Sequence, residues 1–328
     1  MAQPTQVTIT GAAGQVGYAL AFRAAAGELL GPETPIVLRL LDIEPAMPAL
    51  HGVAMELADG AFPLLTDVVV TSDVDQAFDG TSWALLVGAT PRQQGMERGD
   101  LLAANATNFG PQSRAIAARA AADVRVLVVG NPCNTNCLIA RAHAPEVPDE
   151  RWFALTRLDE NRAKAALATK AGAPVSAVTN MAIWGNHSAT QYPDAAHALI
   201  DGRPVPEVIT DEAWLQGEFI TEVQSRGAAI IAARKLSSAG SAAHAIIESV
   251  RSIHLGTPAH DWTSLGVVSQ GEYNVPEGLV FSYPVRSDGE TCTVVSGIDH
   301  AETATRLLDA TTIELLQERS AVQHLLPR

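Results

Sequence analysis

The sequence predicts an α/β protein in two parts, a doubly wound parallel sheet followed by a mixed α+β domain. Apolar runs in the first part are nearly continuous, which is typical of strands buried on both faces of a parallel sheet. Helical patterns lie between these runs, and such alternation indicates parallel strands joined by right-handed crossovers. A chain of 328 residues with 47% hydrophobic content is long enough to build both parts around sizeable cores.

The first part alternates expected strands with expected helices. Strands are expected at 7–10, 36–41, 68–71, 83–89, 124–130 and 152–155. Helices are expected at 16–30, around 50–58 and at 100–122. Gly99 and Asp100 favour the start of the last helix, because aspartate is a common N-cap residue. We therefore place an N-terminal domain at residues 1–155 and a second, substrate-binding domain at residues 156–328.

The second part has a more mixed pattern. We expect a helix after Asp159, a strand at 178–183, helices over about 211–234 and 237–254, short strands within 266–295, and a helix from about 299 onward. Neither an internal repeat nor a low-complexity linker interrupts this pattern.

Composition excludes several classes of partner. The formal net charge is −14 and Lys and Arg form no block, which argues against binding to nucleic acid or to an anionic membrane. No apolar run approaches the ~20 residues that cross a bilayer, and the N-terminus has no signal-peptide pattern. Cys133, Cys137 and Cys292 are an odd number of cysteines without a second ligand pair. We expect them to be reduced and buried in a cytoplasmic protein, and we expect no metal ion.

A glycine loop follows the first expected strand. The loop runs Gly11-Ala12-Ala13-Gly14-Gln15-Val16-Gly17 and leads into a helix, where backbone N–H groups can bind a pyrophosphate. Asp42 ends the second strand and can accept hydrogen bonds from the adenosine ribose, while its charge would repel a 2′-phosphate. These features predict a Rossmann-type domain that binds NAD. The alternative is a plain strand–helix turn with a capping acid.

Polar side chains follow two further strands. Arg92 and Arg98 flank a short glycine-containing segment after the strand at 83–89, at the sheet edge where open parallel sheets bind ligands. Guanidinium groups match carboxylates bidentately, so this segment could close over an anion. Asn131 similarly follows the strand at 124–130 and could donate to a substrate oxygen. A solvated basic turn and an ordinary Asn-Pro turn are the alternatives.

Asp159, Arg162 and His187 carry the expected chemistry. Asp159 and Arg162 are three apart at a helix start and can face one side, and His187 lies in a tight turn after an apolar strand. Removing hydride from a secondary alcohol requires a base for the hydroxyl proton, which imidazole can supply near neutral pH. A carboxylate on the other ring nitrogen would fix the tautomer. The alternative for His187 is a structural histidine.

Six segments together resemble the malate and lactate dehydrogenase family, and most closely its cytosolic-type malate dehydrogenase branch. They are the glycine loop, Asp42, residues 90–98, residues 131–136, residues 158–162 and residues 185–188. Segments 237–243 and 275–284 are also similar to that branch, so the resemblance covers essentially the whole chain.

The resemblance implies a role for each matching residue. Gly11 to Gly17 would hold the pyrophosphate of NAD and Asp42 its adenosine ribose. Asn105 and Gln112 match positions that contact NAD, and Val129, Gly130 and Asn131 would lie at the nicotinamide ribose. His187 would accept the proton, with Asp159 as its partner. Arg162 would bind the carboxylate beside the reacting carbon, Arg98 would polarise the carbonyl, Arg92 would pair with the distal carboxylate, and Ser241 would face the substrate.

The implied activity is the reversible oxidation of malate to oxaloacetate with NAD, a reaction of the tricarboxylic acid cycle, by a homodimer. A lactate-type or broad 2-hydroxy-acid dehydrogenase is the alternative, but a monocarboxylate would leave Arg92 without a partner. A dinucleotide-binding protein without turnover is a second alternative. The chain departs from common family residues at Glu160, Cys133 and Gly240. None of these positions supplies a group that the mechanism requires.

Overall fold

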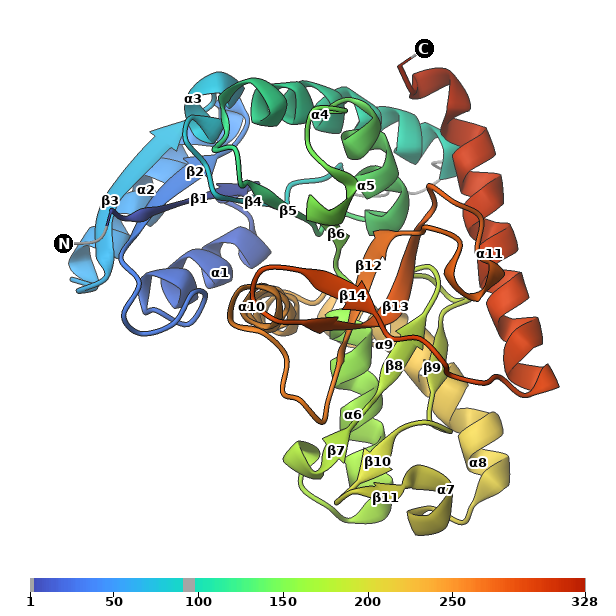
Figure 1. Ribbon diagram of the computed structural model, residues 1–328. Helices are drawn as coiled ribbons and strands as arrows, with labels where there is room; N and C mark the ends of the chain where they lie inside the picture. The colour runs from blue at the N-terminus through green and yellow to red at the C-terminus, as the bar shows by residue number, and fades with distance from the viewer. Residues whose placement is uncertain (1–2, 91–97, 328) are drawn as a thin grey trace.

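The computed structural model describes residues 3–90 and 98–327, and a nine-stranded sheet forms its centre. The strand order is β14-β13-β12-β6-β5-β4-β1-β2-β3 (Figure 1). Six of these strands belong to the first part of the chain and pair in parallel. Their bounds are β1 Thr5–Thr10, β2 Ile36–Leu41, β3 Leu65–Thr71, β4 Trp83–Leu86, β5 Arg125–Val128 and β6 Trp152–Ala154. The predicted doubly wound parallel sheet is therefore confirmed.

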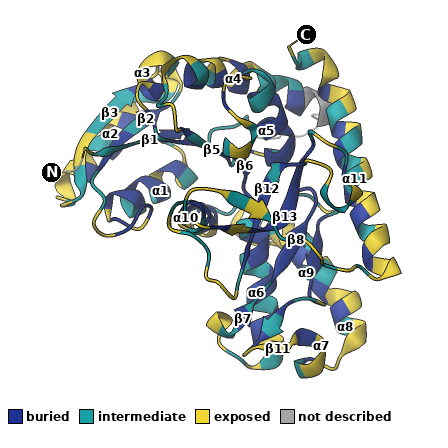
Figure 2. Ribbon diagram, viewed as in Figure 1, coloured by how far each residue is buried: buried dark blue, intermediate teal, exposed yellow. Residues whose placement is uncertain are grey.

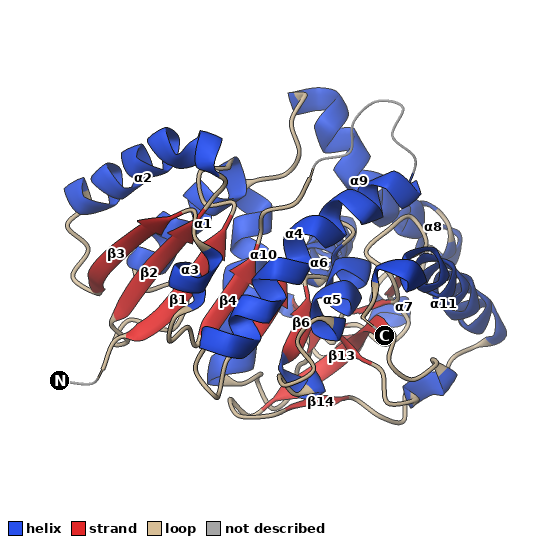
Figure 3. Cartoon of the chain, turned by 90° about the horizontal axis from the view of Figure 1, so that it is seen from above, coloured by secondary structure: helices blue, strands red, loops and turns tan. Residues whose placement is uncertain are grey.

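Helices lie on both faces of this sheet (Figure 3). The helices of the first part are α1 Gln15–Ala25, α2 Met47–Asp59, α3 Val74–Phe78, α4 Arg98–Arg119 and α5 Cys133–Ala142. Helix α1 contacts α2 and α10 (Gly240–Leu255) on one side, while α4 contacts α3 and α5 on the other. The sheet is thus covered on both faces, as its continuous apolar strands require.

The second part of the chain extends the same sheet with antiparallel strands. These strands are β12 Thr263–Val268, β13 Val280–Ser287 and β14 Cys292–Val294. The junction is the antiparallel pairing of Gly266 in β12 with Ala154 in β6. The two parts of the chain therefore share one continuous sheet.

The remaining elements form a lobe beside this sheet, at the bottom of Figure 1. Its helices are α6 Arg157–Ala171, α7 Val205–Val208, α8 Glu212–Gln216 and α9 Glu218–Arg234. Its strands are β7 Val178–Thr179, β8 Ala182–Trp184, β9 Tyr192–Asp194, β10 Leu199–Ile200 and β11 Arg203–Pro204. A long helix, α11 (Glu302–Val322), then packs along α5 and β9.

Several expected elements differ from the observed ones. The expected strand at 178–183 is divided, because Asn180 has a φ of 55° and separates β7 from β8, which belong to different sheets. The expected helix at 211–234 is broken at Gly217, whose φ of −125° and ψ of −85° are not helical. Helices α3 and α5 were not expected. In α5 every residue from Cys133 to Ala140 is buried, polar residues such as Asn134 included, so this span does not have the exposed polar face of a surface helix.

Buried residues fill the space between the sheet and its helices (Figure 2). A smaller apolar cluster lies between α6, α9 and the short strands of the lobe, and includes Leu167, Ile183 and Phe219. All three cysteines are free thiols; Cys133 and Cys137 are buried as predicted, whereas Cys292 is only partly buried. Within the described part of the chain, no helix is long and apolar enough to cross a membrane.

Candidate active site

The glycine loop packs tightly against the end of strand β4. Gly11 has a φ of 64°, and a Cβ there would lie 2.6 Å from the Cα of Gly88. A Cβ on Gly17 would lie 2.5 Å from the carbonyl oxygen of Gly11. Neither position can hold a side chain without moving the backbone. The loop therefore brings strand, turn and helix into close contact.

Helix α1 begins after Gly14, an N-cap residue that has no side chain with which to cap the helix. Gly14 and Gln15 are both exposed. The first N–H groups of a helix lack intrahelical acceptors, and the helix dipole favours an anion beside them. The loop thus fits the pyrophosphate of a dinucleotide.

Asp42 lies beside this loop, as the sequence predicted. Its Oδ2 accepts a hydrogen bond from the Ala13 backbone N–H at 2.9 Å, and its Oδ1 accepts one from the Ile43 N–H at 2.8 Å. These two bonds hold the carboxylate at the carboxyl end of β2. The position fits a group that accepts from ribose hydroxyls.

Two other predicted NAD contacts lie on helix α4. Asn105 is fully buried; its side-chain oxygen accepts from the Thr90 N–H at 2.8 Å, and its NH₂ donates to the Leu101 carbonyl at 3.0 Å. Asn105 therefore ties α4 to the chain after β4. Gln112 is half-buried, and its Oε1 is buried with no hydrogen-bond partner among the described residues. Direct contact of either residue with NAD stays a prediction.

The segment after β5 runs along the same sheet edge. The N–H groups of Val129 and Gly130 both donate to the Leu86 carbonyl, at 2.9 and 3.1 Å. Asn131 follows and is exposed. The segment is therefore fixed by β4, and the exposed position of Asn131 would allow its side chain to meet a ligand.

Asp159 joins the two residues with which it was predicted to act. Its Oδ2 accepts a hydrogen bond from Nδ1 of His187, and its Oδ1 accepts one from Nη1 of Arg162 at 2.9 Å. Asp159 is fully buried, while the side chains of His187 and Arg162 keep 16% and 13% of their surface exposed. A buried carboxylate thus supports two partly exposed groups that face outward together.

The environment keeps Asp159 ionised. Burial alone would raise the pKa of Asp159, but the neighbouring His187 and Arg162 and a hydrogen bond from Gln191 outweigh it and hold that pKa below its usual value. An ionised carboxylate only accepts, so Nδ1 of His187 must carry the proton. Nε2 of a neutral His187 is then the ring nitrogen with a lone pair.

The backbone that carries His187 is held by Asn134 of α5. The Asn134 side-chain oxygen accepts from the His187 N–H at 3.0 Å. Its NH₂ donates to the carbonyl groups of Gly185 at 3.2 Å and Val280 at 3.0 Å. Asn134 lies in the 131–136 segment that resembles the family, but the sequence alone indicated no role for it.

Helix α11 holds the same turn from its other side. Oγ1 of Thr311 accepts from the Asn186 N–H at 2.9 Å, and the Asn186 side chain donates to Glu314 at 2.9 Å and Glu318 at 2.7 Å. Gly185 has a φ of 94°, and a Cβ there would lie 2.2 Å from Cγ2 of Thr311. Only glycine fits between the turn and this helix.

The structure describes only part of the remaining predicted substrate contacts, Arg92, Arg98 and Ser241. Arg92 lies outside the described residues, and Arg98 begins helix α4 with a side chain that is also outside them. Ser241 lies exposed in the first turn of α10. Ser238, three residues earlier, accepts from Nη2 of Arg162 at 3.4 Å. The structure therefore adds Ser238 to the candidate site.

Glu160 is one of the departures from common family residues. It is fully buried and accepts from the Ser264 N–H at 2.6 Å, and it pairs with the Lys164 ammonium group at 2.9 Å. Glu160 therefore joins α6 to β12 and does not enter the candidate site.

Comparison with known families covers nearly the whole chain. Residues 5–153 match the lactate/malate dehydrogenase NAD-binding domain, and residues 156–325 match the lactate/malate dehydrogenase α/β C-terminal domain. The chain belongs to the lactate/malate dehydrogenase family. It is an oxidoreductase of that family, and the NAD cofactor predicted from the glycine loop is confirmed.

Solved structures of both enzyme types resemble this member of the family. A malate dehydrogenase from Naegleria fowleri is 44% identical, with a TM-score of 0.96 over 99% of this chain and 100% of that chain. A lactate dehydrogenase from Trichomonas vaginalis, in complex with NADH and oxamate, is 36% identical, with a TM-score of 0.93 over 98% of this chain and 99% of that chain. A malate dehydrogenase from Plasmodium falciparum is 20% identical, with a TM-score of 0.84 over 98% of this chain and 100% of that chain. It shows the same fold.

Proposed function

We propose that the protein is an NAD-dependent malate dehydrogenase that interconverts (S)-malate and oxaloacetate. The observation that carries the dehydrogenase chemistry is the buried Asp159 carboxylate, which holds His187 and Arg162 side by side. The malate assignment rests on Arg92 in the sequence and on 44% identity to a malate dehydrogenase.

His187 acts as the proton acceptor in malate oxidation. Nε2 takes the proton of the substrate hydroxyl, and the resulting imidazolium is stabilised by the Asp159 carboxylate on Nδ1. Bound NAD supplies the acceptor for the hydride that leaves the same carbon. In the reverse direction His187 returns the proton to the carbonyl oxygen of oxaloacetate.

Arg162 orients the substrate for this transfer. Its Nη1 is held by Asp159 and its Nη2 by Ser238, so the guanidinium plane is fixed before substrate arrives. A fixed guanidinium binds the carboxylate beside the reacting carbon bidentately. Asn131 donates to a substrate oxygen from the sheet edge, and Ser241 faces the substrate from α10.

Arg98 and Arg92 complete the proposed recognition of a dicarboxylate. Arg98 polarises the carbonyl of oxaloacetate, and Arg92 pairs with the distal carboxylate. The alternative is a lactate-type dehydrogenase, which the 36% identity to a lactate dehydrogenase favours. If the proposed site excludes water around the bound substrate, a monocarboxylate would leave Arg92 unpaired there, and an uncompensated buried charge costs roughly 3–5 kcal/mol.

Steady-state rates with oxaloacetate and pyruvate test the assignment. We expect a kcat/KM for oxaloacetate at least about 10²-fold above that for pyruvate, since ~1.4 kcal/mol corresponds to a factor of ten. If kcat/KM for pyruvate equals or exceeds that for oxaloacetate, the malate assignment is overturned, but the assignment as a dehydrogenase still stands. No turnover of NADH with either acid would overturn both.

Two arginine variants separate the roles of the carboxylate contacts. Arg92→Gln should lower kcat/KM for oxaloacetate by about 10²–10³-fold and leave pyruvate unchanged or improved. Arg162→Gln, the matched control, should impair both substrates, because both carry the carboxylate that it binds. If Arg92→Gln lowers kcat/KM equally for oxaloacetate and for pyruvate, Arg92 has a structural role.

We also propose that the enzyme is a cytoplasmic homodimer of the tricarboxylic acid cycle, as its resemblance to the cytosolic-type branch implies. Sedimentation of the purified protein tests the dimer directly.

A further inference from the structure

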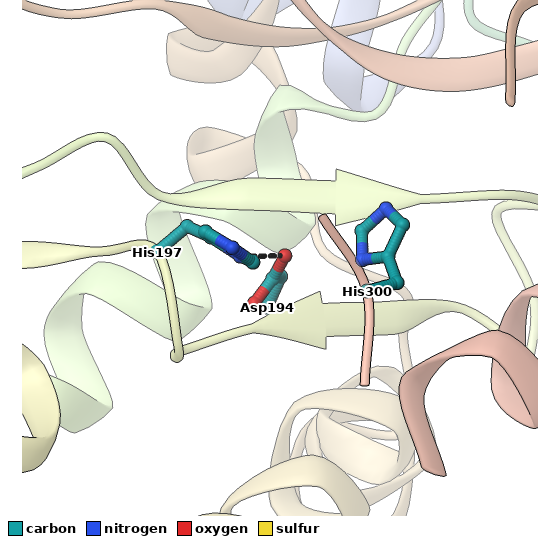
Figure 4. Close-up of side chains that lie close together, drawn as sticks. All are labelled: Asp194, His197 and His300. Carbon is teal, nitrogen blue, oxygen red and sulfur yellow. Dashed lines mark hydrogen bonds and ion pairs between the residues drawn. The ribbon is translucent and has the colours of Figure 1, made fainter. Parts of the chain in front are cut away.

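Asp194, His197 and His300 come together outside the candidate active site (Figure 4). Asp194 ends strand β9, His197 follows three residues later, and His300 lies just before helix α11. One potential ligand atom from each side chain lies within 4.8 Å of the others. Figure 4 shows the Asp194 carboxylate between the two imidazole rings. No motif in the sequence groups these histidines, and His197 and His300 are more than a hundred residues apart.

The Asp194 carboxylate is rigidly held. It is fully buried, and its Oδ2 accepts from Nδ1 of His197 at 2.8 Å and from Nε1 of Trp184 at 3.2 Å. Its Oδ1 accepts from the Ala196 N–H at 3.1 Å and the Tyr192 hydroxyl at 3.4 Å. Three of these donors would remain if His197 gave up its proton. Such supporting bonds orient a carboxylate ligand of a metal ion.

His300 presents ring nitrogens that need a partner. Both are buried, and neither has a hydrogen-bond partner among the described residues. The ring packs edge-on against Trp184, with ring centroids 4.7 Å apart, and lies 5.9 Å from the His197 ring. Burial lowers the pKa of His300, which favours the neutral imidazole. A neutral imidazole with an unused lone pair is the form that ligates metals.

We propose that Asp194, His197 and His300 form a site for one divalent transition-metal ion, with Zn²⁺ as the best fit. Two imidazoles and one carboxylate are a typical ligand set for such ions. The ion would replace the proton between His197 and Asp194. That proton leaves to solvent from Nδ1, and no group is oxidised or reduced.

The distances require only small side-chain movements. With bonds of ~2.0–2.1 Å, ligands around a tetrahedral Zn²⁺ lie about 3.3 Å apart. The His197–Asp194 distance of 2.8 Å would open slightly, and the widest pair, within 4.8 Å, would close. His197 can adjust because 31% of its side chain is exposed.

A cavity borders this site on the side of His197. The cavity has a volume of about 530 Å³, and His197, Asp299 and Ala301 line it. An ion could enter from this side, and a water molecule could complete its coordination. An entry path and an open position are both required of a workable site.

The ion would connect two elements that hold the catalytic histidine. Asp194 is the last residue of β9, at the end of the β8–β9 hairpin opposite the turn that carries His187, and His197 follows it. His300 precedes α11, which binds that turn through Thr311. The ion would therefore stabilise the active-site turn without entering the reaction. Without an ion, His197 and Asp194 are an ordinary hydrogen-bonded pair.

Metal titration of the chelator-treated protein tests the proposal. Co²⁺ should bind one per chain with visible absorption bands of a nitrogen and oxygen site, Zn²⁺ should displace it, and Zn²⁺ should raise the thermal unfolding temperature. His300→Phe keeps an aromatic ring against Trp184 and removes both nitrogens. His300→Phe and His197→Gln should each weaken Co²⁺ binding by at least about 10-fold. The exposed His260 is the matched control, and His260→Gln should bind as the parent does.

Three outcomes would overturn the site. The parent could bind no Co²⁺ or Zn²⁺ at micromolar concentration, both cluster variants could bind as tightly as the parent, or an intense thiolate-to-cobalt band could place the ion on a cysteine. Both cluster substitutions are at partly exposed positions, so circular dichroism should show folded variants. None of these results bears on the proposed malate activity, which is measured separately.

Discussion

Replacing Asp159 by asparagine tests the central pair of the candidate active site. Asp159 offers one oxygen to His187 and the other to Arg162, and both of these partners are donors. An asparagine keeps one oxygen and presents an NH₂ group at the other position. If the NH₂ faces Arg162, two donors oppose each other. If it faces His187, Nδ1 must accept, and the proton moves to Nε2, where it blocks the base.

Either orientation removes the charge that stabilises the imidazolium. We therefore expect Asp159→Asn to lower kcat by about 10²–10⁴-fold, the range of a lost general acid–base function. At ~1.4 kcal/mol per decade this is about 3–6 kcal/mol of transition-state stabilisation. Binding of NADH should change little, because Asp159 contacts neither the glycine loop nor Asp42 in the described hydrogen bonds.

Stopped-flow measurement of NADH oxidation with oxaloacetate gives kcat, and fluorescence titration gives the Kd for NADH. Asp149→Asn is the matched control, since Asp149 also accepts from an arginine, Arg141, but has no histidine partner. Its kcat should stay within about threefold of the parent. A folded Asp159→Asn enzyme with near-parental kcat would refute the role of Asp159. A His187→Asn/Asp159→Asn double variant gives a second test. If its fold-decrease in kcat equals the product of the decreases in the two single variants, the role of Asp159 is also refuted, because the effects of residues that act as a unit are not additive.

Three further predictions concern the cofactor, the catalytic turn and the thiols. Asp42→Ser should weaken NADH binding and reduce the preference for NADH over NADPH, because it removes an acceptor for the ribose hydroxyls and a charge that repels the 2′-phosphate. If the ratio of the Kd values for NADH and NADPH is unchanged, Asp42 does not determine the choice of cofactor. Gly185→Ala should lower the free energy of unfolding by more than about 1–3 kcal/mol, since the added Cβ would lie 2.2 Å from Thr311. A midpoint of urea unfolding equal to that of the parent would contradict this contact. A thiol reagent should label Cys292 before Cys133 and Cys137. Burial raises the pKa of all three thiols, but Cys292 is only partly buried, so the reagent reaches it first. Mass spectrometry that finds Cys137 labelled first in the folded protein would contradict the packing.

The sequence predicted the parts of the fold that depend on local pattern. Buried parallel strands produce continuous apolar runs, so the order of strands and helices in the first part could be predicted. The position of Asp42 directly after the second strand could also be predicted, whereas its hydrogen bond to the Ala13 N–H of the glycine loop was found only in the structure. The cluster of Asp159, Arg162 and His187 followed from chemistry and family resemblance, since 25 residues separate Arg162 from His187 without a pattern that joins them.

The supporting contacts could not be predicted from local pattern. Asn134 contacts His187 across 53 positions, and Thr311 contacts Asn186 across 125. Such pairs leave no periodic signal, because each joins two residues that lie far apart in the sequence. The extension of the sheet by β12 could not be predicted either, since it depends on the single pairing of Gly266 with Ala154.

The position of helix α11 late in the chain determines when, during translation, the catalytic turn can reach its final arrangement. The turn that carries His187 hydrogen-bonds to Thr311, Glu314 and Glu318, which the ribosome adds more than a hundred residues later. A nascent chain that has completed the NAD-binding domain and the His187 turn still lacks these partners. The cofactor domain can therefore fold during translation, whereas the catalytic turn reaches its final arrangement only after residues 302–318 have emerged.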